Sequence, residues 1–356
     1  MKLMTVIGAR PQFVKEAAIQ NRLQAYPDIH EVVVHTGQHY DENMSGVFFD
    51  VLNIRRPDYN LGIKASRHGE MTAKIMMGLE DLMLKESPDV VLLHGDTNST
   101  LAGAITASKL KIPIAHVEAG VRQSVTDMPE EINRALTDRI SSVLFCPSRK
   151  AVENLKKENN PGHICFTGNI MYDVFKRMEP YFDESLFSEL SLIEGGFVVV
   201  TTHRDYNVDT RERLNEILRQ LELLSKDIRV VLPLHPRTKK RIEEFGLQGL
   251  LSSMTVLPPV DYLKLMGLTR RCAFVVTDSG GYQCEAYFAK KKAVLIMDDT
   301  AWSELVGIQT FLCRPEELLE TVRTMPEHPY VEGIYGNGTA ADKTVALLHD
   351  LYGSQE

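Results

Sequence analysis

The sequence predicts an α/β protein made of two Rossmann-like domains, each with a doubly wound parallel sheet, that face each other across a cleft. Short apolar runs, such as residues 90–93 and 114–117, alternate with segments of helical periodicity, which is typical of parallel strands joined by crossover helices. The same alternation starts again near residue 196 without a visible repeat of sequence. The 356 residues are also enough for two domains of ordinary size.

The first domain is predicted to span residues 1–170. Helical periodicity covers residues 66–85, and a further helix is expected at 172–178. Gly168 and Asn169 stand just before that second helix, which is why we expect the domain to end there. The expected strands lie at residues 2–7, 30–36, 90–93, 114–117, 141–146 and 165–168.

The second domain is predicted to span residues 171–339, with an amphipathic helix at 210–224. The remaining segment, 340–356, carries a helix at about 340–351 whose apolar stripe must pack against another part of the protein. That stripe is formed by Val345, Leu347, Leu348 and Leu351. The expected strands of the second domain lie at residues 196–201, 229–234, 251–257, 273–277 and 293–297.

Composition and charge exclude several classes of protein. A formal net charge of -8 argues against a nucleic-acid partner. No apolar run approaches the roughly 20 residues that span a bilayer, and the first strand begins at the N-terminus, where a signal peptide would otherwise lie. The five cysteines form no CxxC pair, which favours reduced thiols and a cytoplasmic location. HExxH, clustered His/Cys and GxSxG patterns are absent, so we expect no metal and no serine-hydrolase site.

Carboxylates follow two apolar runs at the points where the predicted strands end. Asp96 comes shortly after the first run and Glu118 directly after the second, while Glu130 and Glu131 open a helix behind Pro129. In open α/β sheets, ligands bind outside the carboxyl ends of the strands. Carboxylates gathered there would repel one another in a mere scaffold, and we interpret them as groups for acid/base chemistry.

Two segments have the composition of anion sites. The turn from Gly8 to Phe13 leads into a helix that carries Lys15, and Arg10 adds a second cation at the helix N-terminus. This is a weak phosphate signal, and Arg10 could equally form a surface ion pair. The stronger signal is residues 278–281, Asp-Ser-Gly-Gly, where two glycines let backbone N–H groups approach an anion.

Three further side chains follow strands of the second domain. Glu285, about one turn into the helix that begins near Gly281, is suited to accept hydrogen bonds from a ribose diol. The alternative is a helix-capping turn with a solvated glutamate. His203 and His235 each stand just after a strand, where contact with a ligand and a structural role are about equally expected. A phosphate and ribose site opposite a group of carboxylates suits proton transfer at a sugar carbon, with the phosphate as leaving group.

Several of these segments together resemble the non-hydrolysing UDP-N-acetylglucosamine 2-epimerases. The resemblance extends from Arg10 to about Glu304, nearly the whole chain. It implies a two-domain fold like that of the B-type glycosyltransferases, a C-terminal helix that crosses back to the first domain, a homodimer and no added cofactor. The matching segments are residues 8–13, 95–97, 117–120 with Arg122, 128–134, 203–204 and 278–281.

The family's reaction, as the resemblance implies it, removes the C2 proton and UDP from a UDP-2-acetamido sugar, forms a 2-acetamidoglucal, and adds UDP back with protonation on the opposite face. Asp96, Glu118 and Glu130 are then the acid/base carboxylates, and His203 lies near the diphosphate. Glu131 is expected to support its helix. The residues expected to hold the UDP-sugar are Arg10, Lys15, His203, His235, Ser279, Gly280, Gly281 and Glu285.

The sequence also departs from the commonest pattern of that family. Residues 282–286 read Tyr-Gln-Cys-Glu-Ala in place of Ile-Gln-Glu-Glu-Ala, and Trp302 replaces an arginine that helps to bind UDP. Residues 285–288, Trp302 with residues 304–306, and residues 37–41 resemble instead the branch that acts on UDP-2,3-diacetamido-2,3-dideoxy-glucuronic acid. In the commoner branch the segment at 37–41 contributes to an allosteric site for a second UDP-N-acetylglucosamine, and its altered residues put that regulation in doubt here.

Three other functions stay open from the sequence. A hydrolysing relative would release free N-acetylmannosamine and UDP. A glycosyltransferase of the same fold would need an acceptor groove, which the group of carboxylates argues against. An inactive UDP-sugar-binding protein is disfavoured because all three carboxylates are present.

Overall fold

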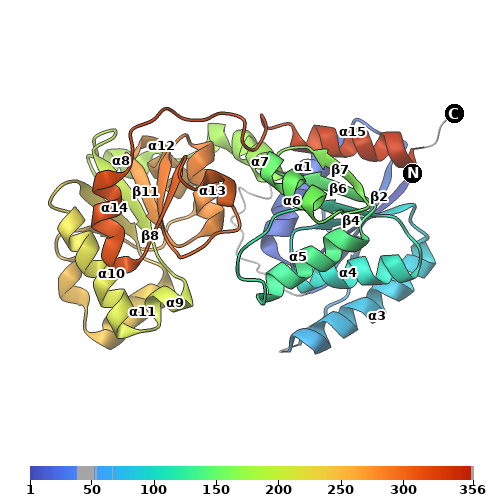
Figure 1. Ribbon diagram of the computed structural model, residues 1–356, viewed down its shortest axis with the longest axis horizontal. Coiled ribbons are helices and arrows are strands. Elements are labelled where there is room, and N and C mark those ends of the chain that lie inside the picture. Colours follow the sequence, from blue (N-terminus) through green and yellow to red (C-terminus); the bar gives the residue numbers. More distant parts are fainter. Residues whose placement is uncertain (38–51, 53, 66, 354–356) are drawn as a thin grey trace. The chain divides into compact units, whose positions relative to one another are not determined.

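The computed structural model describes residues 1–37, 52, 54–65 and 67–353 (Figure 1). The chain divides into two compact units. Unit 1 comprises Met1–Arg177 and Gly333–Glu356, and unit 2 comprises Met178–Glu332. Helix α7 (Ile170–Met178) therefore belongs almost entirely to unit 1, whereas the sequence assigned it to the second domain. Each unit is built on one parallel sheet, which confirms the predicted α/β fold class; the predicted cleft stays a prediction.

The sheet of unit 1 has seven strands in the order β3-β2-β1-β4-β5-β6-β7. All neighbours pair in parallel, and the order reverses direction between β1 and β4. That reversal is the switch point at which open α/β sheets bind ligands. The strands are β1 (Lys2–Ile7), β2 (His30–His35), β3 (Tyr59–Asn60), β4 (Val90–His94), β5 (Ile114–Val117), β6 (Val143–Cys146) and β7 (His163–Phe166).

Helices cover both faces of this sheet, because alternate strand residues point to opposite sides and both sides are apolar. Leu3 and Leu92 pack on one face with Ile19, while Met4 and Leu93 pack on the other face. The helices of unit 1 are α1 (Arg10–Leu23), α3 (His68–Glu86), α4 (Asn98–Lys109), α5 (Pro129–Ile140), α6 (Arg149–Lys157), α7 (Ile170–Met178) and α15 (Ala340–Tyr352).

The C-terminal helix α15 packs against α1 in unit 1, beside the N-terminal strand (Figure 1). Val345 and Leu348 are buried there, whereas Leu351 is 43% exposed and does not belong to the buried stripe. Asp173 of α7 fixes the start of α15 by accepting hydrogen bonds from the N–H groups of Ala340 and Ala341 at 3.1 and 2.7 Å. Since a helix begins with unpaired N–H groups, this carboxylate supplies the missing cap.

The sheet of unit 2 has six parallel strands in the order β10-β9-β8-β11-β12-β13, with its switch point between β8 and β11. The strands are β8 (Phe197–Thr201), β9 (Arg229–Pro233), β10 (Thr255–Leu257), β11 (Phe274–Thr277), β12 (Lys292–Ile296) and β13 (Thr310–Cys313). The α-helices are α8 (Ser185–Glu189), α9 (Asp205–Val208), α10 (Arg211–Leu224), α11 (Pro236–Phe245), α12 (Tyr262–Arg271), α13 (Gly280–Phe288) and α14 (Leu318–Thr324). Short 3-10 turns lie at Glu179–Tyr181, Gln248–Leu251, Ser303–Leu305 and Pro315–Glu317.

Three parts of the strand prediction were wrong. The edge strands β3 and β13 were not predicted, and the run at 251–257 forms a strand only over its last three residues, behind a 3-10 turn.

All five cysteines are free thiols, and four of them are buried. Within the described part of the chain, no helix is both long and apolar enough to cross a membrane.

Candidate active site

Lys15 of α1 lies beside the loops that follow β4 and β5 of unit 1, and these loops carry two of the predicted carboxylates. Lys15 forms an ion pair with Glu118, and these two side chains are only 9% and 11% exposed. A Cβ atom added to Gly95 would lie 3.6 Å from Lys15 Nζ and 3.9 Å from Glu118 Oε1, so the loop before Asp96 runs directly beside this pair. Lys15, predicted to bind UDP, is therefore also the charge partner of Glu118.

Asp96 has its own cationic partner, which the sequence analysis missed. Its carboxylate pairs with Arg134 of α5, and its backbone oxygen accepts a hydrogen bond from Asn133 Nδ2 at 2.8 Å. Arg134 also bonds to Glu131 at 3.1 Å. Asn133 and Arg134 both belong to the segment 128–134 that was matched to the family, but sequence spacing does not reveal that they hold Asp96.

The two adjacent glutamates of α5 differ in surroundings. Glu131 is buried, accepts the Gln123 N–H at 3.1 Å and pairs with Arg134, which agrees with its expected supporting role. Glu130 is exposed on the first turn of α5. An exposed carboxylate remains available to a bound molecule, and its predicted catalytic role stays a prediction.

The side chain of Gln12 holds the turn from Gly8 into α1. Gln12 Oε1 accepts the N–H groups of Gly8 and Ala9 at 2.7 and 2.9 Å, and Gln12 Nε2 donates to the His94 carbonyl at 2.6 Å. Those two backbone donors are thus occupied, which weakens the predicted anion site of this turn. Arg10 is exposed at the start of α1 and forms no ion pair with any described residue, which disfavours the surface-ion-pair alternative.

In unit 2 the loops after β8 and β11 are joined by one buried carboxylate. Asp278 accepts hydrogen bonds from Thr202 Oγ1 at 2.8 Å and from the N–H groups of His203 and Arg204, each at 2.9 Å. Asn207 Nδ2 adds a fourth donor at 3.2 Å. His203 Nδ1 lies 3.3 Å from the same carboxylate; burial lowers the pKa of His203, although the charge of Asp278 acts in the opposite direction.

The two predicted histidines of unit 2 lie together, with ring centroids 5.2 Å apart. His235 is exposed and caps α11, because its Nδ1 accepts the Arg237 N–H at 3.2 Å. A structural role for His235 is therefore present, and a ligand contact at its exposed ring edge stays a prediction.

The first turn of α13 has the geometry of an anion site. Ser279 caps the helix by accepting the Tyr282 N–H at 3.3 Å, and Gly280 and Gly281 leave the first turn without side chains. The unpaired N–H groups of a helix N-terminus attract phosphate. A Cβ atom on Gly280 would lie 3.5 Å from Trp302 Cδ1, so the indole that replaces the family's arginine borders this turn.

Glu285 lies further along α13. Burial raises the pKa of Glu285 to about 8, and no described residue donates a hydrogen bond to its carboxylate. The residue is half-buried, which disfavours the alternative of a fully solvated glutamate, and its carboxyl group lacks donors among the described residues. The hydroxyls of a ribose would supply them.

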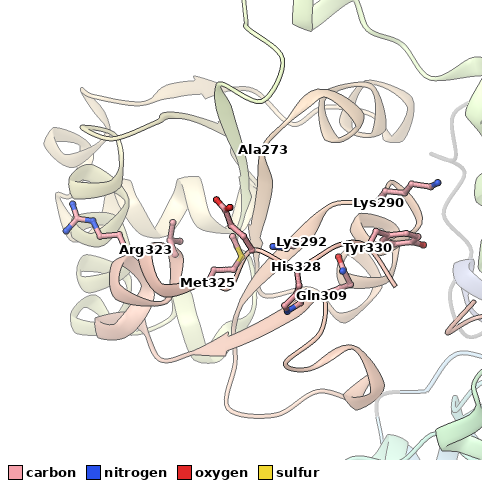
Figure 2. Close-up of a pocket in the computed structure, with 10 residues that line it drawn as sticks. Ala273, Lys290, Lys292, Gln309, Arg323, Met325, His328 and Tyr330 are labelled. Atoms are coloured by element: carbon pink, nitrogen blue, oxygen red, sulfur yellow. The ribbon is translucent and has the colours of Figure 1, made fainter. Parts of the chain in front are cut away.

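The cavity in Figure 2, of about 390 Å³, lies elsewhere in unit 2. Ala273 precedes β11, Lys292 begins β12 and Gln309 precedes β13, so the cavity adjoins the amino ends of these strands. The predicted residues follow the carboxyl ends, and none of them lines this cavity. Lys292 Nζ is already bonded to the Pro326 carbonyl at 2.6 Å.

Two other predictions concern the family's allosteric segment and a metal site. Residues 38–41 of the segment matched to the family's allosteric site lie outside the described residues, so the sequence comparison of this segment stays untested. Among the residues that the structure describes, no group of three or more His, Cys, Asp or Glu side chains is arranged to hold a metal ion.

A buried acidic network lies behind the unit 1 site and was not predicted. Glu16 Oε2 lies 2.7 Å from His94 Nε2, and both side chains are buried. Burial raises the pKa of Glu16 to about 7 and lowers that of His94 to about 3. Burial also raises the pKa of the neighbouring Glu31 well above its usual range. The network is therefore most stable with protonated carboxyl groups and a neutral imidazole.

This network predicts that Glu16→Gln stabilises the protein at pH 8 but hardly at pH 4.5. Because folding raises the pKa of Glu16 from 4.5 to about 7, stability is lost as the pH rises between these values. The gain of the variant above pH 7 is expected to reach about 3 kcal/mol. Urea unfolding at both pH values measures it, with Glu80→Gln on the exposed face of α3 as the control. Equal pH dependence of wild type and Glu16→Gln would contradict the prediction.

The fold and these two groups of residues define the class: a Rossmann-type protein of two units, with carboxylates after neighbouring strands of one sheet and a glycine-rich helix start after a strand of the other. A family model described as UDP-N-acetylglucosamine 2-epimerase matches residues 21–349. The chain is 42% identical to the UDP-2,3-diacetamido-2,3-dideoxy-D-glucuronate 2-epimerase of Pseudomonas aeruginosa, over 99% of this chain and 100% of the relative. It is 39% identical to a UDP-N-acetylglucosamine 2-epimerase of Methanocaldococcus jannaschii, over 98% and 99%.

The solved structure of an M. jannaschii UDP-GlcNAc 2-epimerase in complex with UDP-GlcNAc and UDP matches with a TM-score of 0.83, at 38% identity, over 98% of this chain and 100% of that one. The chain belongs to the UDP-N-acetylglucosamine 2-epimerase family. This confirms the predicted family and the predicted enzyme class, an isomerase.

Proposed function

We propose that this protein inverts C2 of a UDP-2-acetamido sugar by eliminating UDP and adding it back. A carboxylate takes the C2 proton, the C1–oxygen bond breaks, and UDP leaves with the electron pair, so that a C1–C2 double bond forms. In the return step a proton reaches C2 from the opposite face while a UDP oxygen bonds to C1. Both half-reactions need two proton-transferring groups and a stabilised leaving diphosphate.

The observation that carries the proposal is the pair of ion-paired carboxylates, Asp96 and Glu118, at the carboxyl ends of neighbouring strands β4 and β5. Together with Glu130 they supply the proton-transferring groups. Lys15 and Arg134 balance their charge, so that carboxylates can stand side by side. In unit 2, the first turn of α13 and His203 receive the diphosphate, and Glu285 receives the ribose.

The relatives support a narrower choice of substrate. One acts on UDP-2,3-diacetamido-2,3-dideoxy-D-glucuronate and another on UDP-N-acetylglucosamine, and the first is the more similar of these two. Trp302, which we matched to the diacetamido branch, borders Gly280 at the proposed diphosphate site. We therefore favour the diacetamido uronate as substrate, in a cytoplasmic enzyme.

NMR in D2O with each of the two UDP-sugars tests the proposal. Deuterium at C2 together with a mixture of UDP-sugar epimers is the expected result. Free sugar without a UDP-sugar epimer would indicate a hydrolysing enzyme instead. UDP binding without C2 exchange of either sugar would overturn the proposal and leave the glycosyltransferase or an inactive binding protein.

UDP affinity is expected to rise with pH because of Glu285. In the protein without UDP, the carboxyl group of Glu285 has a pKa of about 8. Two ribose hydroxyls donate better to its ionised form, so UDP binding releases a proton. Between pH 7 and 9 the affinity should therefore rise by up to about tenfold. Calorimetric titration with UDP at both pH values measures this rise. Glu285→Gln should bind with little pH dependence, and an equal rise in that variant would contradict the assignment.

We further propose that the enzyme works as a homodimer through helix α5. Ile132, Leu136 and Ile140 form an apolar stripe one turn apart, and they are 45%, 49% and 36% exposed. Helical stripes of this kind pair readily with their own copy across a two-fold axis.

Leu136→Glu is therefore expected to convert a dimer into a monomer, since it places a charge in the proposed interface. Light scattering coupled to gel filtration measures the mass. Leu223→Glu on α10 of unit 2, where the leucine is 40% exposed, is the matched control and should stay dimeric. A monomeric wild type, or a dimeric Leu136→Glu, would contradict the assignment of this interface.

A further inference from the structure

A buried histidine and a buried aspartate adjoin the backbone of the two carboxylate-bearing loops of unit 1. His116 of β5 and Asp138 of α5 are both 0% exposed, with His116 Nδ1 2.7 Å from Asp138 Oδ1. His116 Nε2 lies 2.7 Å from the backbone oxygen of Gly95. Both ring nitrogens of His116 therefore face oxygen atoms, one of a carboxylate and one of a backbone carbonyl.

The second oxygen of Asp138 binds the loop after β5. It accepts the Gly120 N–H at 2.9 Å and a hydrogen bond from Arg122 Nη1 at 2.7 Å. Burial acts to raise the pKa of Asp138, but the hydrogen bonds and charges of His116 and Arg122 outweigh it and lower this pKa. The buried charge is thus satisfied by hydrogen bonds on both oxygens, as a buried ion pair requires.

These contacts hold the chain on both sides of Glu118. Asp138 bonds to His116, two residues before Glu118, and to Gly120, two residues after it. Glu118 itself has φ = 74°, in the left-handed region that a non-glycine residue adopts only at a cost. Such a conformation persists where the surroundings impose it. Asp138 therefore holds both sides of the strained residue.

The same pair reaches the loop that carries Asp96. Gly95 has φ = 64°, its N–H donates to the Val117 oxygen at 3.0 Å, and its own oxygen accepts from His116. Asn133, on the same helix as Asp138, donates to the Asp96 backbone oxygen at 2.8 Å. One helix and one strand thus fix the backbone of both carboxylate-bearing loops.

We propose that His116 and Asp138 are positioning residues that set the separation and direction of Asp96 and Glu118 for proton transfer at C2. The inference rests on the proposed function, because it gives these loops a chemical task. Neither side chain reaches a substrate, since both are fully buried. Their effect is therefore expected on the chemical step rather than on binding, because small displacements of reacting groups slow a proton transfer strongly.

The test is Asp138→Asn, assayed for C2 deuterium exchange with whichever of the two UDP-sugars the wild type turns over. We expect kcat to fall on the order of 100-fold, while KM and UDP affinity change less than about threefold. The matched control is Asp173→Asn, the same substitution at another carboxylate of unit 1 that accepts two backbone N–H groups. It should lower the unfolding midpoint but leave kcat within about threefold of wild type.

A kcat of Asp138→Asn equal to that of the control would overturn the inference, and so would a parallel fall of kcat and UDP affinity. Should Asp138→Asn fail to fold, Arg122→Gln tests the same carboxylate, because it removes the hydrogen bond that the half-buried Arg122 donates to Asp138. It should lower kcat in the same direction with KM unchanged, and an unchanged kcat would overturn the inference. Absence of C2 exchange in the wild type would overturn the proposed function as well, which distinguishes the two failures.

Discussion

Glu118→Gln should abolish deuterium incorporation at C2 while UDP binding to the protein persists. The amide is close in size to the carboxylate but cannot accept the proton, and general acid–base groups contribute about 10²–10⁴-fold to such steps. The amide also leaves Lys15 without its ion-pair partner, although Lys15 is largely buried. We therefore expect a loss toward the upper end of that range, with UDP affinity little changed because most of the proposed UDP contacts come from unit 2.

Proton exchange is followed by NMR in D2O and UDP binding by calorimetry. Glu153→Gln, on the exposed side of α6, is the control and should exchange normally. Normal exchange by Glu118→Gln would show that Glu118 has another role. A loss of UDP affinity as large as the loss of exchange would instead assign it to binding.

The positions of Asp96 and Glu118 were predictable because each follows an apolar run that forms a buried parallel strand. The end of such a strand is visible in the sequence as a switch from apolar to polar residues, and the Rossmann topology then places neighbouring strand ends together. The edge strands β3 and β13 lack this signal. The first is only two residues long, and the second is a four-residue run behind polar residues.

The charge partners of the carboxylates could not be predicted in the same way. Lys15 reaches Glu118 across 103 positions of sequence and Arg134 reaches Asp96 across 38, and neither contact follows a local spacing rule. Lys15 was assigned to phosphate because it stands in the first turns of a helix, which is a local signal. The structure adds the long-range contact, which depends on how β1 and β4 pair at the switch point.

The buried polar residues behind the site were invisible for a related reason. His116 and Glu16 lie in otherwise apolar or helical patterns, and periodicity predicts burial without predicting a partner. Their partners, Asp138 and His94, are fixed by packing of helices on the sheet. Only Glu131 among the buried acids was given a structural role from sequence, because it stands next to Glu130 on one helix turn.

Asp278→Asn is expected to have the largest effect on unit 2. The buried carboxylate accepts hydrogen bonds from Thr202, the His203 and Arg204 N–H groups and Asn207, all between 2.8 and 3.2 Å. An asparagine offers one acceptor oxygen, and its NH2 group would face N–H and O–H donors. Each buried donor left unpaired costs about 1–3 kcal/mol, so a loss of about 3 kcal/mol or more in the free energy of unfolding is expected.

The same substitution should weaken UDP binding by more than about tenfold, because the loops after β8 and β11 lose the group that holds them together beside Ser279 and Gly280. Asp261→Asn is the matched control: Asp261 caps α12 through one hydrogen bond to the Lys264 N–H at 3.0 Å, and asparagine caps helices about as well as aspartate. Urea unfolding and calorimetry with UDP measure both effects. Wild-type UDP affinity in a folded Asp278→Asn would mean that the switch point of unit 2 does not bind UDP. A joint loss that the control lacks would tie nucleotide binding to this single carboxylate.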